Sequence, residues 1–171
     1  MIELRNLTPG DAPAVQQIYS GASVAFTRTH GMTAKEAADY VEHTIAHART
    51  TPQERWCFGI TVGGDDAVGL VKFREHGQRH ATMSYILRED TWGNGYATEA
   101  AKQAVAHAFT HAEITRLSAK HHPDNPASGR VSTKAGFVQT GSTPTGPTLG
   151  RPRVDFPVYE IRRPQDPDNR T

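Results

Sequence analysis

Residues 87–100 have the sequence LREDTWGNGYATEA and are the most informative part of the chain. They follow an alternating strand pattern, pass the two glycines Gly93 and Gly95, and enter a segment with helical spacing. Glycines at such a turn let the backbone approach a ligand, and the unpaired N–H groups of a helix N-terminus attract phosphate oxygens. The stretch therefore predicts either a pyrophosphate site or only a tight strand-to-helix turn, which two glycines alone would also give.

Two common phosphate loops are excluded. A Walker loop ends in Gly-Lys-Ser/Thr, whereas this loop ends in Gly95, Tyr96 and Ala97. A dinucleotide fingerprint needs a third small residue where this chain has Thr98. The class of ligand therefore has to be inferred from the sequence on either side of the loop.

On the N-terminal side, apolar alternation predicts strands over residues 56–62, 67–73 and 81–87. Glycine and aspartate at 63–66 predict a hairpin turn, so the three strands form an antiparallel meander. On the C-terminal side, apolar positions at helical spacing predict a helix that packs one face on a sheet. These positions are Ala97, Ala100, Ala101, Ala104, Val105, Ala108, Phe109 and Ala112.

The N-terminal end predicts a strand at 2–7 and a helix from Ala12 to Ile18. A loop follows at 21–31, and Thr33 with Glu36 predicts the capped start of a helix that runs to about His47.

The C-terminal end predicts strands at 115–120, 137–140 and 154–161, a helix at 126–135 and a loop at 143–152. The polar tail, Arg163 to Thr171, is expected to be disordered. We therefore predict a single mixed α/β (α+β) domain over residues 1–162, with one sheet and helices on both faces.

Composition narrows the function. The 19 basic and 18 acidic residues leave a net charge of +1 with no long basic run, so nucleic acid is a poor candidate partner. The single cysteine, Cys57, and the lack of a leader pattern at Met1 favour the cytoplasm. No apolar stretch is long enough for a membrane span.

Residues 87–100 resemble the acetyl-CoA loop and following helix of the GNAT superfamily of N-acetyltransferases, in particular the branch of ribosomal-protein N-terminal acetyltransferases. Residues 125–128 (NPAS) and 134–137 (KAGF) resemble the second signature of that branch at matching separation. The likeness extends to residues 4–8 and 155–159 and so covers nearly the whole chain. It implies a GNAT-like domain with a mostly antiparallel twisted sheet.

The resemblance also implies a binding site for acetyl-CoA as the cosubstrate, without a metal. The loop backbone and the hydroxyl of Thr98 would hold the pyrophosphate, and Leu87, at the splayed end of its strand, would bind pantetheine and the thioester carbonyl. Asn125 and Ser128 would hold the distal pantetheine or the nucleotide; Lys134 would reach a phosphate or only favour the helix dipole. The implied loop residues are Trp92, Gly93, Asn94, Gly95, Tyr96, Ala97 and Thr98.

The catalytic residues depart from the family pattern. Many GNAT enzymes place a tyrosine acid where this chain has Ser132, whose hydroxyl can still donate a hydrogen bond to the sulfur. For the base, His121 or His122 would lie near the cleft, and a histidine titrates near neutrality. Comparable candidates are Glu75, His76 and His80, while Thr82 replaces a glutamate that is frequent in the branch.

The implied activity is direct transfer of acetyl from acetyl-CoA to a primary amine, either a small molecule or a protein N-terminus. The amine would lie over the loops 21–31 and 143–152, where Phe26, Arg28 and His30 could shape its site. Two alternatives stay open: a non-catalytic acyl-CoA sensor domain and a nucleotide-binding module that uses the glycine loop. GNAT-like domains frequently pair, and strand 154–161 is a candidate edge for a homodimer.

Overall fold

The computed structural model describes residues 1–145 and 153–165. Its helices are α1 (Ala12–Ile18), α2 (Ala34–Ala48), α3 (Tyr96–His111) and α4 (Pro126–Lys134). Its strands are β1 (Ile2–Asn6), β2 (Arg55–Val62), β3 (Ala67–Glu75), β4 (His80–Leu87), β5 (Arg116–Lys120), β6 (Val138–Thr145) and β7 (Val154–Arg162). There are also three short 3-10 turns. The turn η1 (Pro9–Asp11) precedes α1, η2 (Gly21–Val24) follows α1, and η3 (Glu89–Thr91) follows β4.

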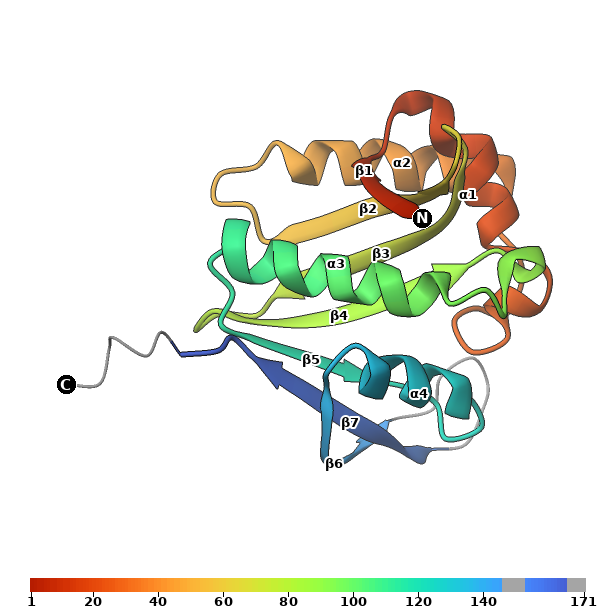
Figure 1. The fold of residues 1–171 in the computed structure, drawn as a ribbon. Coiled ribbons are helices and arrows are strands. Elements are labelled where there is room, and N and C mark those ends of the chain that lie inside the picture. Colours follow the sequence, from red (N-terminus) through yellow and green to blue (C-terminus); the bar gives the residue numbers. More distant parts are fainter. Residues whose placement is uncertain (146–152, 166–171) are drawn as a thin grey trace.

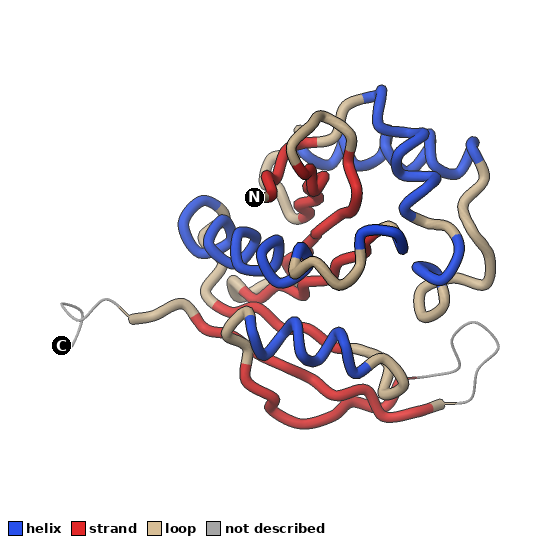
Figure 2. The backbone as a smooth tube through the Cα atoms, turned by 45° about the vertical axis from the view of Figure 1, so that its right-hand side comes forward, coloured by secondary structure: helices blue, strands red, loops and turns tan. Residues whose placement is uncertain are grey.

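All seven strands form one sheet in the order β1-β2-β3-β4-β5-β7-β6. Only the β4–β5 pair is parallel, and the other five pairs are antiparallel. Figure 1 shows α3 and α4 in front of the sheet with α1 and α2 behind it, and Figure 2 shows the strands passing between the two groups of helices. The predicted mixed α/β domain with a mostly antiparallel sheet and helices on both faces is confirmed.

Each face of the sheet has its own apolar core. Val15 of α1 and Val41 of α2 pack on Leu70 and Ile86 behind the sheet. In front, α3 presents a stripe of buried alanines to the sheet, as its helical spacing predicts. Small side chains let this helix lie close to the strands, so its N-terminus is held firmly beside the end of β4.

Two loop predictions need correction. The segment 21–31, predicted as a loop, contains the turn η2. The loop predicted from Thr143 begins later, because β6 passes an irregularity in its pairing near Gly141 and then continues alongside β7 to Thr145. The remainder of that loop, residues 146–152, and the tail residues 166–171 lie outside the described residues, while residues 163–165 form no helix or strand.

The strand predicted as a dimer edge is not an edge. Strand β7 pairs with β5 on one side and with β6 on the other, so its backbone is already hydrogen-bonded within the sheet. The edges of the sheet are β1 and β6. The argument for a homodimer through residues 154–161 is therefore wrong, and the homodimer itself stays a prediction.

A bidentate ion pair fixes the entry into α1. Both terminal nitrogens of Arg5 lie 2.8 Å from the carboxylate oxygens of Asp11, and the N–H of Thr8 donates to the same carboxylate at 2.7 Å. Asp11 is buried. These hydrogen bonds, that of Arg5 first, lower the pKa of Asp11 below its usual value.

We expect Asp11→Asn to lower the free energy of unfolding by about 1–3 kcal/mol, because a buried charged acceptor is lost and Arg5 is left without it. Denaturant unfolding measures this, with Asp39→Asn as the control, since the exposed Lys35–Asp39 pair should contribute much less to stability. Because the folded pKa is depressed, the contribution is complete above the unfolded pKa and is lost as pH falls through the folded pKa. Equal losses in the two variants would contradict the assignment.

Candidate active site

The candidate site begins where the parallel pairing of β4 and β5 stops. The register joins His80 to Arg116 and ends at Thr82 opposite Ser118, although both strands continue. Beyond this point the strands splay apart, and a cavity of about 160 Å³ opens between them. It is lined by β4, the end of β5, the loop that follows β5, and α4. We call it the cleft cavity.

The predicted phosphate loop lies at the end of β4 and leads directly into α3. Gly93 and Gly95 have φ angles of 80° and 78°, in the left-handed region that favours glycine, and Gly95 is the N-cap of α3. No side chain in the described ranges caps this helix. The first N–H groups of α3, from Tyr96 to Thr98, lack acceptors within the helix. They point out of its N-terminus, toward the space in front of the glycine turn.

The loop is held in shape by its own side chains. The indole N–H of Trp92 donates to the carbonyl of Leu87 at 3.1 Å, and the Asn94 amide donates to the carbonyls of Thr91 and Trp92 at 3.0 and 3.2 Å. A Cβ added to Gly93 or Gly95 would meet nothing within 4 Å. The space in front of both glycines is therefore open to a ligand.

Leu87 links this loop to the loop after α1. Its carbonyl accepts a second hydrogen bond, from the Ser23 hydroxyl at 2.8 Å, and the nearby Glu89 carboxylate accepts from the N–H of Ala22 at 3.0 Å. The side chain of Leu87 is buried in the core in front of the sheet. Because its carbonyl already has two donors, a contact between Leu87 and pantetheine would have to use other atoms of the residue.

Helix α4 brings three of the predicted residues together. Asn125, Ser128 and Ser132 all line the cleft cavity, and Asn125 does not use its side chain to cap α4 although it occupies the N-cap position. Lys134 is separated from them. It lines a shallow hollow on the other side of α4, together with Pro126 and Gly129.

Two hydroxyl groups meet in the cleft cavity. Ser132 is buried and lines this cavity. Tyr85 of β4 lines the same cavity. Burial raises the pKa of Tyr85, and a hydrogen bond with Ser128 opposes this in part, so the phenol stays protonated near neutrality. Tyr85 was not predicted from the sequence; the available signal was its position in a strand that ends at the glycine loop.

His121 is placed beside the cleft but is already engaged. Its Nδ1 lies 2.7 Å from the carbonyl of His122 and its Nε2 lies 3.4 Å from the Tyr159 hydroxyl. The Nδ1–H tautomer, donating to the carbonyl and accepting from the tyrosine, satisfies both contacts. Gly129 makes this packing possible, since a Cβ there would lie 2.7 Å from both His121 Nε2 and the Tyr159 hydroxyl.

His122 lies between two aromatic rings at the mouth of the cleft. Its ring stacks on Phe26 at 5.2 Å and meets Phe156 edge-on at 5.3 Å. Its Nδ1 accepts the N–H of Asp124 at 3.0 Å, which leaves the proton of the neutral ring on Nε2. Phe26, which was predicted to shape the acceptor site, is thus brought to the cleft.

The other candidate bases lie at the paired end of β4. His80 Nε2 is 2.6 Å from the Ser118 hydroxyl, and burial lowers the pKa of His80. His76 Nε2 is 2.7 Å from the Thr82 hydroxyl, at the point where the splay begins. No cluster of three or more histidine, cysteine or acidic side chains is placed to hold a metal ion within residues 1–145 and 153–165.

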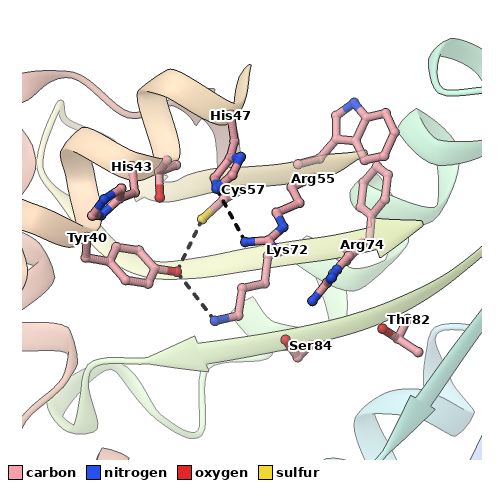
Figure 3. Close-up of a pocket in the computed structure, with 12 residues that line it drawn as sticks. Tyr40, His43, His47, Arg55, Cys57, Lys72, Arg74, Thr82 and Ser84 are labelled. Atoms are coloured by element: carbon pink, nitrogen blue, oxygen red, sulfur yellow. Dashed lines mark hydrogen bonds between the residues drawn. The ribbon is translucent and has the colours of Figure 1, made fainter. Parts of the chain in front are cut away.

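A larger cavity lies behind the sheet. It has a volume of about 540 Å³ and is formed by α2 and the strands β2, β3 and β4 (Figure 3). We call it the α2 pocket. Ser84 of β4 lines both this pocket and the cleft cavity, so the two cavities adjoin at the splay. Sequence analysis did not anticipate the α2 pocket.

A cleft between splayed parallel strands, with a glycine turn at the N-terminus of the next helix, is the arrangement expected from the resemblance to acetyl-CoA-dependent transferases. The chain belongs to the GNAT family: the model of the acetyltransferase (GNAT) domain matches residues 2–138. No helix of the described part is long and apolar enough to cross a bilayer.

Individual proteins agree with this assignment. The chain is 28% identical to the uncharacterized N-acetyltransferase YoaA of Bacillus subtilis, over 95% of this chain and 94% of that protein. A GNAT-family acetyltransferase from Bacillus anthracis shares the fold with a TM-score of 0.80 at 20% identity, covering 94% of each chain. Mycobacterium smegmatis RimJ, solved with CoA-disulfide, gives a TM-score of 0.79 at 23% identity, covering 94% of this chain and 81% of RimJ.

We expect Gly129→Ala to destabilise the protein by about 1–3 kcal/mol, because the added methyl would overlap His121 and Tyr159. The steric cost of the methyl group therefore has to exceed the stabilisation of about 1 kcal/mol that alanine gives over glycine inside a helix. Thermal or denaturant unfolding measures the change, and Gly64→Ala is the control because its added Cβ meets nothing within 4 Å. A stabilised Gly129→Ala variant would show that His121 and Tyr159 are free to move.

Proposed function

We propose that this protein is an N-acetyltransferase that moves an acetyl group from acetyl-CoA to a primary amine, of a small molecule or of a protein N-terminus. The observation that carries the proposal is the left-handed glycine turn at the uncapped N-terminus of α3, beside the point where β4 and β5 separate. Membership of the GNAT acetyltransferase family supports it.

Acetyl-CoA would bind between β4 and β5. Its pyrophosphate would accept hydrogen bonds from the first N–H groups of α3 and from the Thr98 hydroxyl, where the helix dipole also favours negative charge. Pantetheine would run along the unpaired edge of β4 after Thr82, with Asn125, the N-cap of α4, and Ser128 on its other side. This route places the thioester in the cleft cavity, close to Tyr85 and Ser132.

In the chemical step, the neutral amine attacks the thioester carbon, the new C–N bond forms, and the C–S bond breaks. The amine loses a proton and the departing thiolate takes one up. Ser132 and Tyr85, which stays protonated, both line the cleft cavity and would donate a hydrogen bond to the sulfur. Such a bond strengthens as charge reaches the sulfur, so it favours the transition state.

Proton removal from the amine is assigned less directly. His121 was predicted as the base, but it could act only after giving up its contact with His122 or with Tyr159. Where no side chain accepts the proton, water in the cleft takes that role and positioning supplies most of the acceleration. The alternative of a non-catalytic acyl-CoA sensor shares the same binding site and differs only in lacking turnover.

We expect acetyl-CoA to bind with micromolar-scale affinity in calorimetry and Gly95→Asn to weaken binding at least tenfold. Asparagine tolerates a left-handed backbone, so the variant should fold, but its side chain would occupy the open space where the pyrophosphate is proposed to lie. Gly63→Asn is the matched control, because Gly63 also has a positive φ and open surroundings but lies in the β2–β3 hairpin. Unchanged affinity in folded Gly95→Asn would remove the loop from the binding site.

We expect Ser132→Ala and Tyr85→Phe each to lower kcat by about tenfold to a hundredfold with little change in acetyl-CoA affinity, since both remove only a hydroxyl group. A thiol-release assay over a panel of amines measures kcat. His121→Gln separates two roles: a base would give a pH–rate profile that rises through the histidine range and loses that limb in the variant. A structural histidine would give an unchanged profile and lower stability.

If neither hydroxyl variant changes kcat, proton transfer to the sulfur would have to come from water. Absence of turnover with every amine, together with normal acetyl-CoA binding, would favour the sensor alternative.

A further inference from the structure

The α2 pocket carries an unbalanced positive charge. Arg55 of β2 and Lys72 and Arg74 of β3 line it, and no acidic side chain does (Figure 3). None of the three makes an ion pair with any residue in the described ranges, whereas five other arginines of this chain do, for example Arg5 with Asp11.

The sheet register brings two of these charges together. Arg55 and Arg74 are direct cross-strand partners, which places their side chains on the same face of the sheet and about 5 Å apart at Cβ. Like charges in this arrangement repel, and within residues 1–145 and 153–165 the guanidinium group of Arg55 has its hydrogen-bond contact with His47, whose Nε2 lies 3.3 Å from Nη1. An anion between the two guanidinium groups would replace repulsion by charge-assisted hydrogen bonds.

Lys72 adds a positive charge deeper in the pocket. Its ammonium group donates to the hydroxyls of Tyr19 and Tyr40 at 3.2 and 3.4 Å and lies 5.9 and 5.6 Å from the centres of their rings. Burial raises the pKa of Tyr40, as it does that of the neighbouring Cys57 thiol, so neither supplies a negative charge near neutrality. The ammonium is positioned by neutral groups and its charge is not balanced.

The positively charged side chains of the α2 pocket lie close enough to the cleft for one small substrate to reach both. Lys72 pairs directly with Ser84, the residue that lines both cavities, and Arg74 pairs with Thr82, the last residue of β4 before the splay. Diagonal neighbours in such a ladder are about 7–8 Å apart. An extended dipeptide spans about 7 Å, so its amine could reach the splay while a negatively charged group reaches Lys72 and Arg74.

We propose that the α2 pocket is the acceptor site and that it selects amines that carry an anionic group, a carboxylate or a phosphate, which Arg55, Lys72 and Arg74 bind. The proposal rests on the acetyltransferase function proposed above and names its substrate class. It follows that polycationic amines are poor acceptors, because the same three charges repel them.

A binding experiment tests the pocket without catalysis. Protein saturated with CoA, so that the pyrophosphate site is filled, is titrated with inorganic phosphate in a calorimeter at low ionic strength. We expect saturable binding that Arg74→Gln and Arg55→Gln each weaken about tenfold or more and that Arg74→Lys partly restores. Lys102→Gln is the matched control, since it removes one positive charge from an exposed position on α3. Absence of saturable binding, or equal binding in all variants, would overturn the anion site.

Turnover then tests whether the anion belongs to the acceptor. Matched amine pairs that differ in one anionic group are compared by kcat/KM: glycylglycine with glycylglycinamide for the carboxylate, and O-phosphoethanolamine with ethanolamine for the phosphate. We expect the anionic member of at least one pair to be favoured about tenfold or more, with the preference lost in Arg74→Gln through KM rather than kcat, and spermidine to be acetylated most slowly.

The outcomes separate the two proposals. Turnover of neutral or cationic amines at rates equal to the anionic ones, unaffected by Arg74→Gln, would refute the substrate class and leave the acetyltransferase function standing. If no amine turns over, the acetyltransferase function fails, and the acceptor inference fails with it even where phosphate binds.

Discussion

The end of parallel pairing between β4 and β5 is the feature on which the rest of the structure depends. After Thr82 and Ser118 the two strands separate, although each continues, and the hydrogen bond between His80 and Ser118 at 2.6 Å lies at the end that stays paired. Backbone groups on the inner edge of β4 are then left without a partner strand. A ligand or water has to satisfy them, so the splay creates a binding site from backbone alone.

The two helical layers turn this opening into a site with two different sides. In front, α3 presents uncapped N–H groups and α4 presents small hydroxyl and amide side chains, a surface suited to a long ligand with a pyrophosphate. Behind, α2 and the strand side chains form a larger pocket with uncompensated positive charge. Ser84 joins the two sides, so reactants that enter from opposite faces of the sheet would meet at the splay.

Much of this arrangement follows from local sequence patterns. The alanine spacing of α3 fixes its buried face, and residues 125–128, singled out by the resemblance to GNAT enzymes, supply Asn125 and Ser128 to the lining of the cleft cavity. What sequence could not predict depends on strand order and register. Strand β7 was predicted as an edge, yet the pairing of β6 beside it places it inside the sheet. Arg55 and Arg74 are far apart in sequence and meet only through the β2–β3 register.

The roles of two side chains could likewise not be predicted from the sequence. His121 is a plausible base by position, but its ring contacts depend on Gly129 and Tyr159, which come from other elements. Tyr85 was missed because only the placement of α4 shows which face of β4 borders the cleft.

A crystal structure of the complex with acetyl-CoA tests the central claim most directly. The account predicts pyrophosphate oxygens within about 3 Å of the N–H groups at the start of α3, pantetheine between β4 and β5, and the thioester in the cavity lined by Tyr85 and Ser132. Acetyl-CoA bound elsewhere, with residues 93–98 and the splay free of it, would contradict the account.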